Sequence, residues 1–121
     1  MQNWLQYITE TYSAEAEHPF ADSPEVAVFR HIGNRKWFAI RMVIPRARLG
    51  LPGEAPIAIL NLKCDPMAAG SFRAMPGIFP AYHMNKTHWL SVALDGSADT
   101  EAVKLLLEMS YDLTAPKRKR R

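Results

Sequence analysis

The sequence contains one cysteine, Cys64, and no long run of apolar residues. A single cysteine cannot form an internal disulfide, which excludes a disulfide scaffold and fits a reducing compartment. The apolar runs are far shorter than the roughly 18 residues that a membrane-spanning helix needs. The first residues also lack a cationic leader followed by an apolar block, so we expect no export signal. These absences predict a cytoplasmic protein with no membrane partner.

Length and composition indicate one ordinary globular domain. The chain has 121 residues, of which 48% are hydrophobic and 22% charged. A domain of this size buries roughly 65% of its unfolded surface, enough for one real core. We therefore expect a single α+β domain over residues 1–116 and a monomer. Residues 117–121 are predicted to be a basic, disordered tail.

Basic charge is concentrated at the end of the chain. The formal net charge is +3, from 15 Lys and Arg against 12 Asp and Glu. Five of the basic residues are the last five, Lys117, Arg118, Lys119, Arg120 and Arg121. Without these five, ten basic side chains face twelve acidic ones, a net charge of about −2. The alkaline isoelectric point, about 9.2, is therefore a property of the tail.

Hydrophobic periodicity predicts a helix, a hairpin, a strand, a short helix, a strand and a last helix. Trp4, Ile8 and Tyr12 recur at helical spacing and indicate a helix over about residues 2–14. Residues 26–44 alternate around Gly33-Asn34, which is typical of a β-hairpin. In the second arm, alternation places one set of side chains on one face, namely Phe38, Ile40, Met42 and Ile44. The opposite face then carries Trp37, Ala39, Arg41 and Val43.

The second half of the chain adds two strands and two helices. Residues 45–56 hold three prolines and are expected to form a mobile loop, and residues 57–62 a strand. Asp65-Pro66 is a helix-start signal. We expect a short extended segment at residues 79–82 and a strand at residues 89–94. Ser97 or Asp99 can cap a last helix whose inward stripe is Val103, Leu106, Leu107 and Ser110. This order predicts a two-layer fold with a mainly antiparallel sheet and helices packed on one face.

No catalytic or metal centre is indicated. Cys64 with His83 or His88 is the only thiol–imidazole combination, and nothing in the spacing brings them together. No serine stands in a Gly-x-Ser-x-Gly turn. The two histidines supply half of a zinc-ligand pattern without a Cys-x-x-Cys pair. We therefore predict no catalytic residue, no metal ligand and no cofactor.

Two short polar segments each lead into a strand through basic residues and a tryptophan. They are Asn34-Arg35-Lys36-Trp37 and Asn85-Lys86-Thr87-His88-Trp89. Cations at such turns can meet phosphates, while aromatic rings can stack on exposed bases. Polar turn residues are normally solvated, and tryptophan is normally part of the core. The candidate DNA-binding residues are Arg35, Lys36, Arg41, Lys86, His88, Trp89 and the five cations 117–121.

These segments also carry a family resemblance. The run Phe79-Pro80-Ala81-Tyr82-His83-Met84-Asn85-Lys86-Thr87-His88-Trp89, continuing through Leu94-Asp95-Gly96-Ser97, resembles the MmcQ/YjbR-like family. So do Phe29-Arg30-His31, Lys36-Trp37-Phe38-Ala39, Asn61-Leu62-Lys63-Cys64-Asp65-Pro66 and Met109-Ser110-Tyr111-Asp112-Leu113. The resemblance covers about residues 26–114. It implies a frataxin-like (CyaY-like), double-wing fold and a DNA-binding label that rests on fold analogy. It implies no catalytic residues. It also implies no iron binding, because the first predicted helix lacks the acidic ridge that frataxin-type iron handling requires.

Two classes of function follow from these observations. The first is a small non-enzymatic DNA-binding protein that contacts the phosphate backbone through basic hairpin tips. The alternative is a protein- or small-ligand-interaction module with no nucleic-acid role, which the net negative charge of residues 1–116 favours. An enzyme built on Cys64 or the histidines is the least supported.

Overall fold

The computed structural model describes residues 2–116. The tail predicted at 117–121 lies outside these residues, so its disorder stays a prediction. The elements, in chain order, are α1 (Trp4–Tyr12), β1 (Ala27–Arg30), β2 (Trp37–Pro45), a 3₁₀ helix η1 (Arg46–Leu49), β3 (Pro56–Lys63), α2 (Pro66–Arg73), β4 (Ile78–Pro80), β5 (Trp89–Ala93) and α3 (Thr100–Thr114). The predicted order of helices and strands is confirmed, with η1 inside the expected loop.

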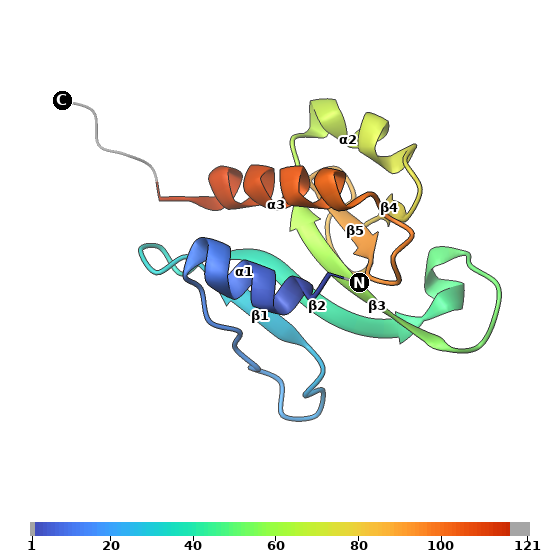
Figure 1. Cartoon of the computed structure of the whole chain (residues 1–121), viewed down its shortest axis with the longest axis horizontal. Helices are drawn as coiled ribbons and strands as arrows, with labels where there is room; N and C mark the ends of the chain where they lie inside the picture. The colour runs from blue at the N-terminus through green and yellow to red at the C-terminus, as the bar shows by residue number, and fades with distance from the viewer. Residues whose placement is uncertain (1, 117–121) are drawn as a thin grey trace.

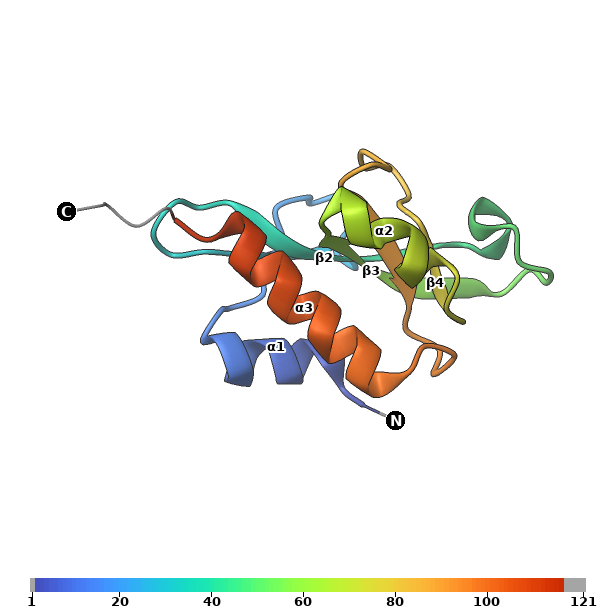
Figure 2. The ribbon, with the colours of Figure 1, turned by 90° about the horizontal axis from the view of Figure 1, so that it is seen from above.

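The strands form one sheet in the order β1-β2-β3-β5-β4, and every neighbouring pair is antiparallel. Helices α1 and α3 cover one face of this sheet (Figures 1 and 2). Helix α2 packs beside β4 and β5 at the opposite edge from β1. The structure therefore confirms a two-layer α+β fold with an antiparallel sheet and helices on one face.

Each α-helix begins where a polar side chain satisfies its free backbone N–H groups. The side chains of Asn3, Asp65 and Asp99 accept hydrogen bonds from the backbone N–H groups of Gln6, Met67 and Ala102. Of the two cap candidates for the last helix, Asp99 is the one used.

The main core lies between the sheet and these helices. Its sheet side includes the fully buried Leu60, Leu62, Leu90 and Val92. Its helix side includes Ile8 and the predicted stripe of α3, in which Val103, Leu106, Leu107 and Ser110 are all buried. Burial of this apolar area is the main source of stability.

A β-bulge near the start of β2 changes the predicted faces. Arg30 pairs with Trp37, but Phe29 pairs with Ala39, so Phe38 is an extra residue. Phe38 and Ala39 both enter the helix-side core, while Trp37 packs with Ile40 on the other side. The prediction that Phe38 shares a face with Ile40 is therefore wrong, because strict alternation ends at the bulge.

The opposite face of the sheet, here called the open face, has none of the three α-helices on it (Figure 2). Alternation along the strands places Ile40, Asn61 and Ser91 there. The chain covers this face with three irregular segments, which are residues 15–25, 46–55 and 81–88. Buried Val26, Val28 and Ile40 form a small second core beneath them.

Candidate nucleic-acid interface

The first basic segment is the turn between β1 and β2. Arg35 has a left-handed backbone with φ of 64°, and its side chain is 66% exposed. The Asn34 side chain accepts from the Lys36 N–H (3.0 Å) and donates to the Thr114 carbonyl (2.9 Å). The turn is thus closed by its own asparagine and fastened to the end of α3, which leaves Arg35 and Lys36 directed to solvent.

The second basic segment lies in the 81–88 connection between β4 and β5. Lys86 and His88 are exposed. The Asn85 side chain accepts from the Thr87 N–H (2.8 Å), and the Arg73 guanidinium of α2 donates to the Lys86 carbonyl (3.1 Å). As in the first turn, an asparagine and a helix hold the backbone while the cationic side chain stays free for a partner.

The strands that follow these two turns begin at the same end of the sheet. Ala39 of β2 pairs with Leu62 of β3, which pairs with Leu90 of β5. Two strand spacings separate the outer pair, about 10 Å. Trp37 and Trp89 are both half-buried in the same open-face cluster. The tertiary structure therefore joins the bases of two segments that are fifty residues apart, whereas the turns themselves extend in different directions (Figure 2).

Arg41 is not brought into this group. It lies within β2 opposite Leu60, on the helix-covered face, and its guanidinium donates to the Glu25 carbonyl (3.0 Å). Lys117 to Arg121 lie beyond the described residues. The last described residue, Pro116, lies so close to Gly33 that a Cβ on this glycine would be 2.8 Å from the proline Cγ. The end of the described chain therefore lies beside the first basic turn.

Two further cations on the open face were missed from the sequence. Lys63 pairs with Trp89 and shares the face of Asn61, so it stands between β2 and β5 at the same end of the sheet. The Arg30 guanidinium lies 5.4 Å from the centroid of the Trp37 ring. Counting in twos from Asn61 could have found Lys63, but the position of Arg30 over Trp37 depends on the bulge.

An acidic side chain partly offsets this charge. Glu17 Oε1 lies 3.2 Å from Arg30 Nε and 3.9 Å from an Arg35 terminal nitrogen. Glu17 is held there because its backbone pairs with Val28 of β1. Any anion that approaches the first basic turn competes with this carboxylate.

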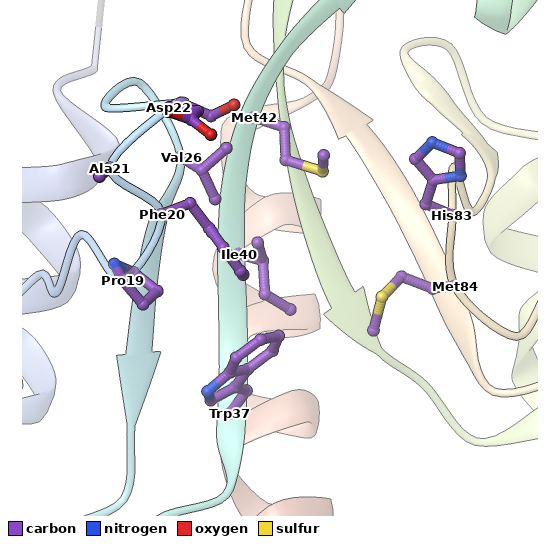
Figure 3. A pocket seen from close by; sticks show the side chains of 11 residues that line it. Pro19, Phe20, Ala21, Asp22, Val26, Trp37, Ile40, Met42, His83 and Met84 are labelled. Carbon is purple, nitrogen blue, oxygen red and sulfur yellow. The ribbon is translucent and has the colours of Figure 1, made fainter.

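An apolar groove of about 560 Å³ runs along β2 on the open face (Figure 3). Its floor is made of Val26, Trp37, Ile40 and Met42, and Phe20 forms one wall. Met84 and His83 stand on the other side (Figure 3). The Phe20 ring is perpendicular to that of Trp37, with centroids 6.5 Å apart, and is 46% exposed. The groove therefore lies between the 15–25 and 81–88 segments.

A buried polar pair fixes the second wall. The Ser91 hydroxyl donates to the Asn61 side chain and accepts from the Tyr82 N–H (2.9 Å), and Asn61 donates to the Tyr82 carbonyl (3.2 Å). Both side chains are fully buried. These two side chains satisfy the backbone N–H and carbonyl of Tyr82, which lies beyond the end of β4. They therefore fix the backbone just before His83 and Met84.

The reactive groups do not gather in one place. Cys64 is buried, and its burial raises the pKa of its thiol, which disfavours the thiolate. Between residues 2 and 116, no three His, Cys, Asp or Glu side chains are arranged so that they could share a metal ion. No helix in that range is long and apolar enough to span a bilayer.

Comparison with known proteins gives consistent matches over most of the chain. The YjbR family model matches residues 9–113. The Bacillus subtilis protein YyaQ is 36% identical over 110 residues, which are 91% of this chain and 93% of YyaQ. A crystal structure of a Pseudomonas syringae protein has a TM-score of 0.91 and 39% identity, covering 95% of this chain and 100% of that one. A Deinococcus radiodurans protein with a DUF419 domain has a TM-score of 0.61 and 29% identity, covering 83% and 67% of the two chains.

Proposed function

This chain belongs to the YjbR family, and we propose that it is a small non-enzymatic DNA-binding protein. In this proposal the two basic turns contact the phosphate backbone. The family match confirms the resemblance recognised from the sequence and extends it to residue 9. One observation carries the proposal. β2 and β5 start at the same end of the sheet, and their first residues, Trp37 and Trp89, pack in one cluster on the open face.

The arrangement of charge supports this proposal. Lys36 directly precedes Trp37, and Lys86 lies three residues before Trp89. Lys63 pairs with Trp89 on the strand between β2 and β5. β2 and β5 are about 10 Å apart at the end of the sheet from which both basic turns extend. Cations on these turns can contact phosphates without reading the sequence of the DNA.

Part of the negative charge of residues 1–116 lies away from the basic turns. Asp99 and Glu101 are at the start of α3, whose other end reaches the first basic turn. Glu101 pairs with Lys104 (3.6 Å) on the same helix. Glu17 faces the first basic turn, and Glu15 lines the same hollow as Arg35. Screening at physiological salt limits the effect of acidic groups more than about 8 Å away.

Salt-dependent titration of duplex and single-stranded DNA tests the proposal. The variants Arg35→Ala, Lys36→Ala and Lys86→Ala should each lower the magnitude of the log–log salt slope for duplex by up to about 0.9. Lys104→Gln is the matched control, because it removes one positive charge from the helix-covered side and should leave the slope unchanged.

A chain that ends at Pro116 separates the tail from the folded surface. If the five tail cations alone make the contact, the slope is about −4.5 for duplex and disappears on truncation. The proposal expects salt-dependent binding to remain after truncation and to fall with the turn variants. Absence of binding by the full chain at low salt would refute it.

A further inference from the structure

We propose that the groove along β2 receives one unpaired base of a single DNA strand whose phosphates lie on the first basic turn. This inference rests on the proposed function and specifies the form of nucleic acid that the surface prefers. It starts from the lining of the groove, which is apolar except for Asp22, Ser23 and His83. A group that enters must be largely apolar and must carry no phosphate with it.

Both basic segments contribute side chains to the groove. Lys36 directly precedes Trp37 on the floor, and Met84 of the second segment stands on the far wall. Lys86 instead lines a separate hollow with Arg48 and Leu49. A strand that lays its phosphates on the first basic turn therefore brings its bases to the groove. The first basic turn is continuous with the apolar groove, which favours a nucleotide over an uncharged apolar ligand. An uncharged ligand would make no ionic contact with these cations.

The side chains of the groove suit a flat ring. Trp37 and Phe20 present two perpendicular aromatic surfaces, and Met84 lies across the groove from them (Figure 3). Stacking on aromatic rings is tolerant of base identity because every base has a π-face. Methionine is flexible and polarisable, so its thioether can adjust to rings of different size. We therefore expect little sequence preference.

The charges at the two ends of the groove give the strand a direction of approach. Arg30 and Lys36 lie at the Trp37 end, whereas Asp22 lies at the other end, beside Val26 and Met42 (Figure 3). Phosphates are attracted to the first end and repelled from the second. The base thus enters from the Trp37 end and the backbone stays outside.

A duplex cannot use the groove without breaking a base pair, because its bases are stacked inside the helix. The structure therefore predicts tighter binding of a single strand than of a duplex that offers the same number of phosphates. Base stacking is worth about 1–3 kcal/mol per base, so the expected difference is about tenfold.

Three labelled DNAs test this inference, namely an oligothymidylate, an abasic strand with the same number of phosphates and a duplex. We expect the abasic strand to bind about tenfold more weakly than the oligothymidylate. The variants Phe20→Ala and Met84→Ala should weaken binding of the oligothymidylate only, because both side chains line the groove. Both residues lie on irregular segments outside the main core, so the substitutions should leave the fold intact. Leu105→Ala on α3, which shortens another exposed apolar side chain (55% exposed), is the matched control.

The outcomes separate the two proposals. Equal binding of the oligothymidylate and the abasic strand, with the salt dependence intact, overturns the base-receiving groove and leaves the proposed function standing. Binding of neither strand nor of the duplex overturns both. If DNA does not displace an apolar fluorescent dye that Phe20→Ala expels, the groove belongs to a protein or small-ligand site and the inference is wrong.

Discussion

The hydroxyl of Ser110 on α3 donates a hydrogen bond to the carbonyl of Phe38 on β2 (2.6 Å). The same oxygen accepts from the N–H of Lys63 on β3 (2.8 Å). It stands just beyond the last pair of the β2–β3 ladder, which joins Ala39 to Leu62. A helix side chain thus satisfies backbone groups that lie past the end of this ladder.

Replacement of this hydroxyl tests its role. Ser110→Ala leaves a buried carbonyl and a partly buried N–H without partners, so we expect the free energy of unfolding to fall by about 2 kcal/mol or more. Urea denaturation measures it. Ser71→Ala, at an exposed position of α2, should change stability by less than about 0.5 kcal/mol. Equal small losses in the two variants would contradict the assignment.

The Ser91 contacts with Asn61 and Tyr82 predict a loss of both stability and position. Ser91→Ala removes the acceptor of the Tyr82 N–H and the donor to Asn61. We expect a loss of about 1–3 kcal/mol in urea denaturation. Amide exchange should also become faster in residues 82–84, because their backbone anchor is gone. Unchanged exchange there would show that the segment is held by other contacts.

Two glycines should respond to alanine in opposite directions. Gly77 has φ of +78°, and an added Cβ would be 2.6 Å from the Ala98 nitrogen. Gly77→Ala is therefore expected to cost more than about 2 kcal/mol. Gly70, inside α2, has nothing within 4 Å of an added Cβ. Gly70→Ala should stabilise the protein by about 0.4–1 kcal/mol. Thermal denaturation of both variants compares them, and a change of the same sign in both would contradict these assignments.

Stability should fall at high pH because of Tyr12. Burial, followed by the nearby Tyr7, Glu108, Asp112 and Tyr111, raises the pKa of Tyr12 from 10.0 to about 12. The folded state therefore holds this proton more tightly than the unfolded state. The stabilisation is complete below pH 10 and is lost as the pH rises to about 12.

Tyr12→Phe isolates this effect, because it removes the titrating hydroxyl and keeps the ring that stacks on Tyr111, with centroids 4.6 Å apart. Urea denaturation across this pH range should show a weaker pH dependence in the variant. A pH dependence identical to that of the wild type would assign the alkaline loss to other groups.

Glu17→Gln should strengthen DNA binding if the proposed function holds. The carboxylate competes with phosphate for Arg30 and Arg35, so its neutralisation frees positive charge at the first basic turn. Because these groups are partly exposed, the expected gain is about two- to fivefold in affinity at low salt. Glu54→Gln, at an exposed position of the 46–55 segment, should leave affinity unchanged. A weaker complex with Glu17→Gln would mean that the ion pairs serve to hold the turn.

The sequence by itself determined the elements and most of the core. Helix spacing of apolar residues placed α1 and α3. Local cap chemistry placed the start of α2 at Asp65 and that of α3 at Ser97 or Asp99, of which the structure uses Asp99. These signals are readable because hydrogen bonds within one turn depend on neighbours in the chain. The family resemblance was also legible, since its motifs are continuous runs of residues.

Only the tertiary structure decided which face each side chain of the candidate site occupies. The extra residue Phe38 reverses the alternation in β2 and turns Trp37 to the open face. The carbonyl of this residue is bonded by the hydroxyl of Ser110, which is 72 residues away in the chain. The grouping of Lys63 with Trp89, and of Phe20 with Met84 across one groove, likewise follows from strand order. Such contacts depend on how the whole chain packs, so no local pattern could have revealed them.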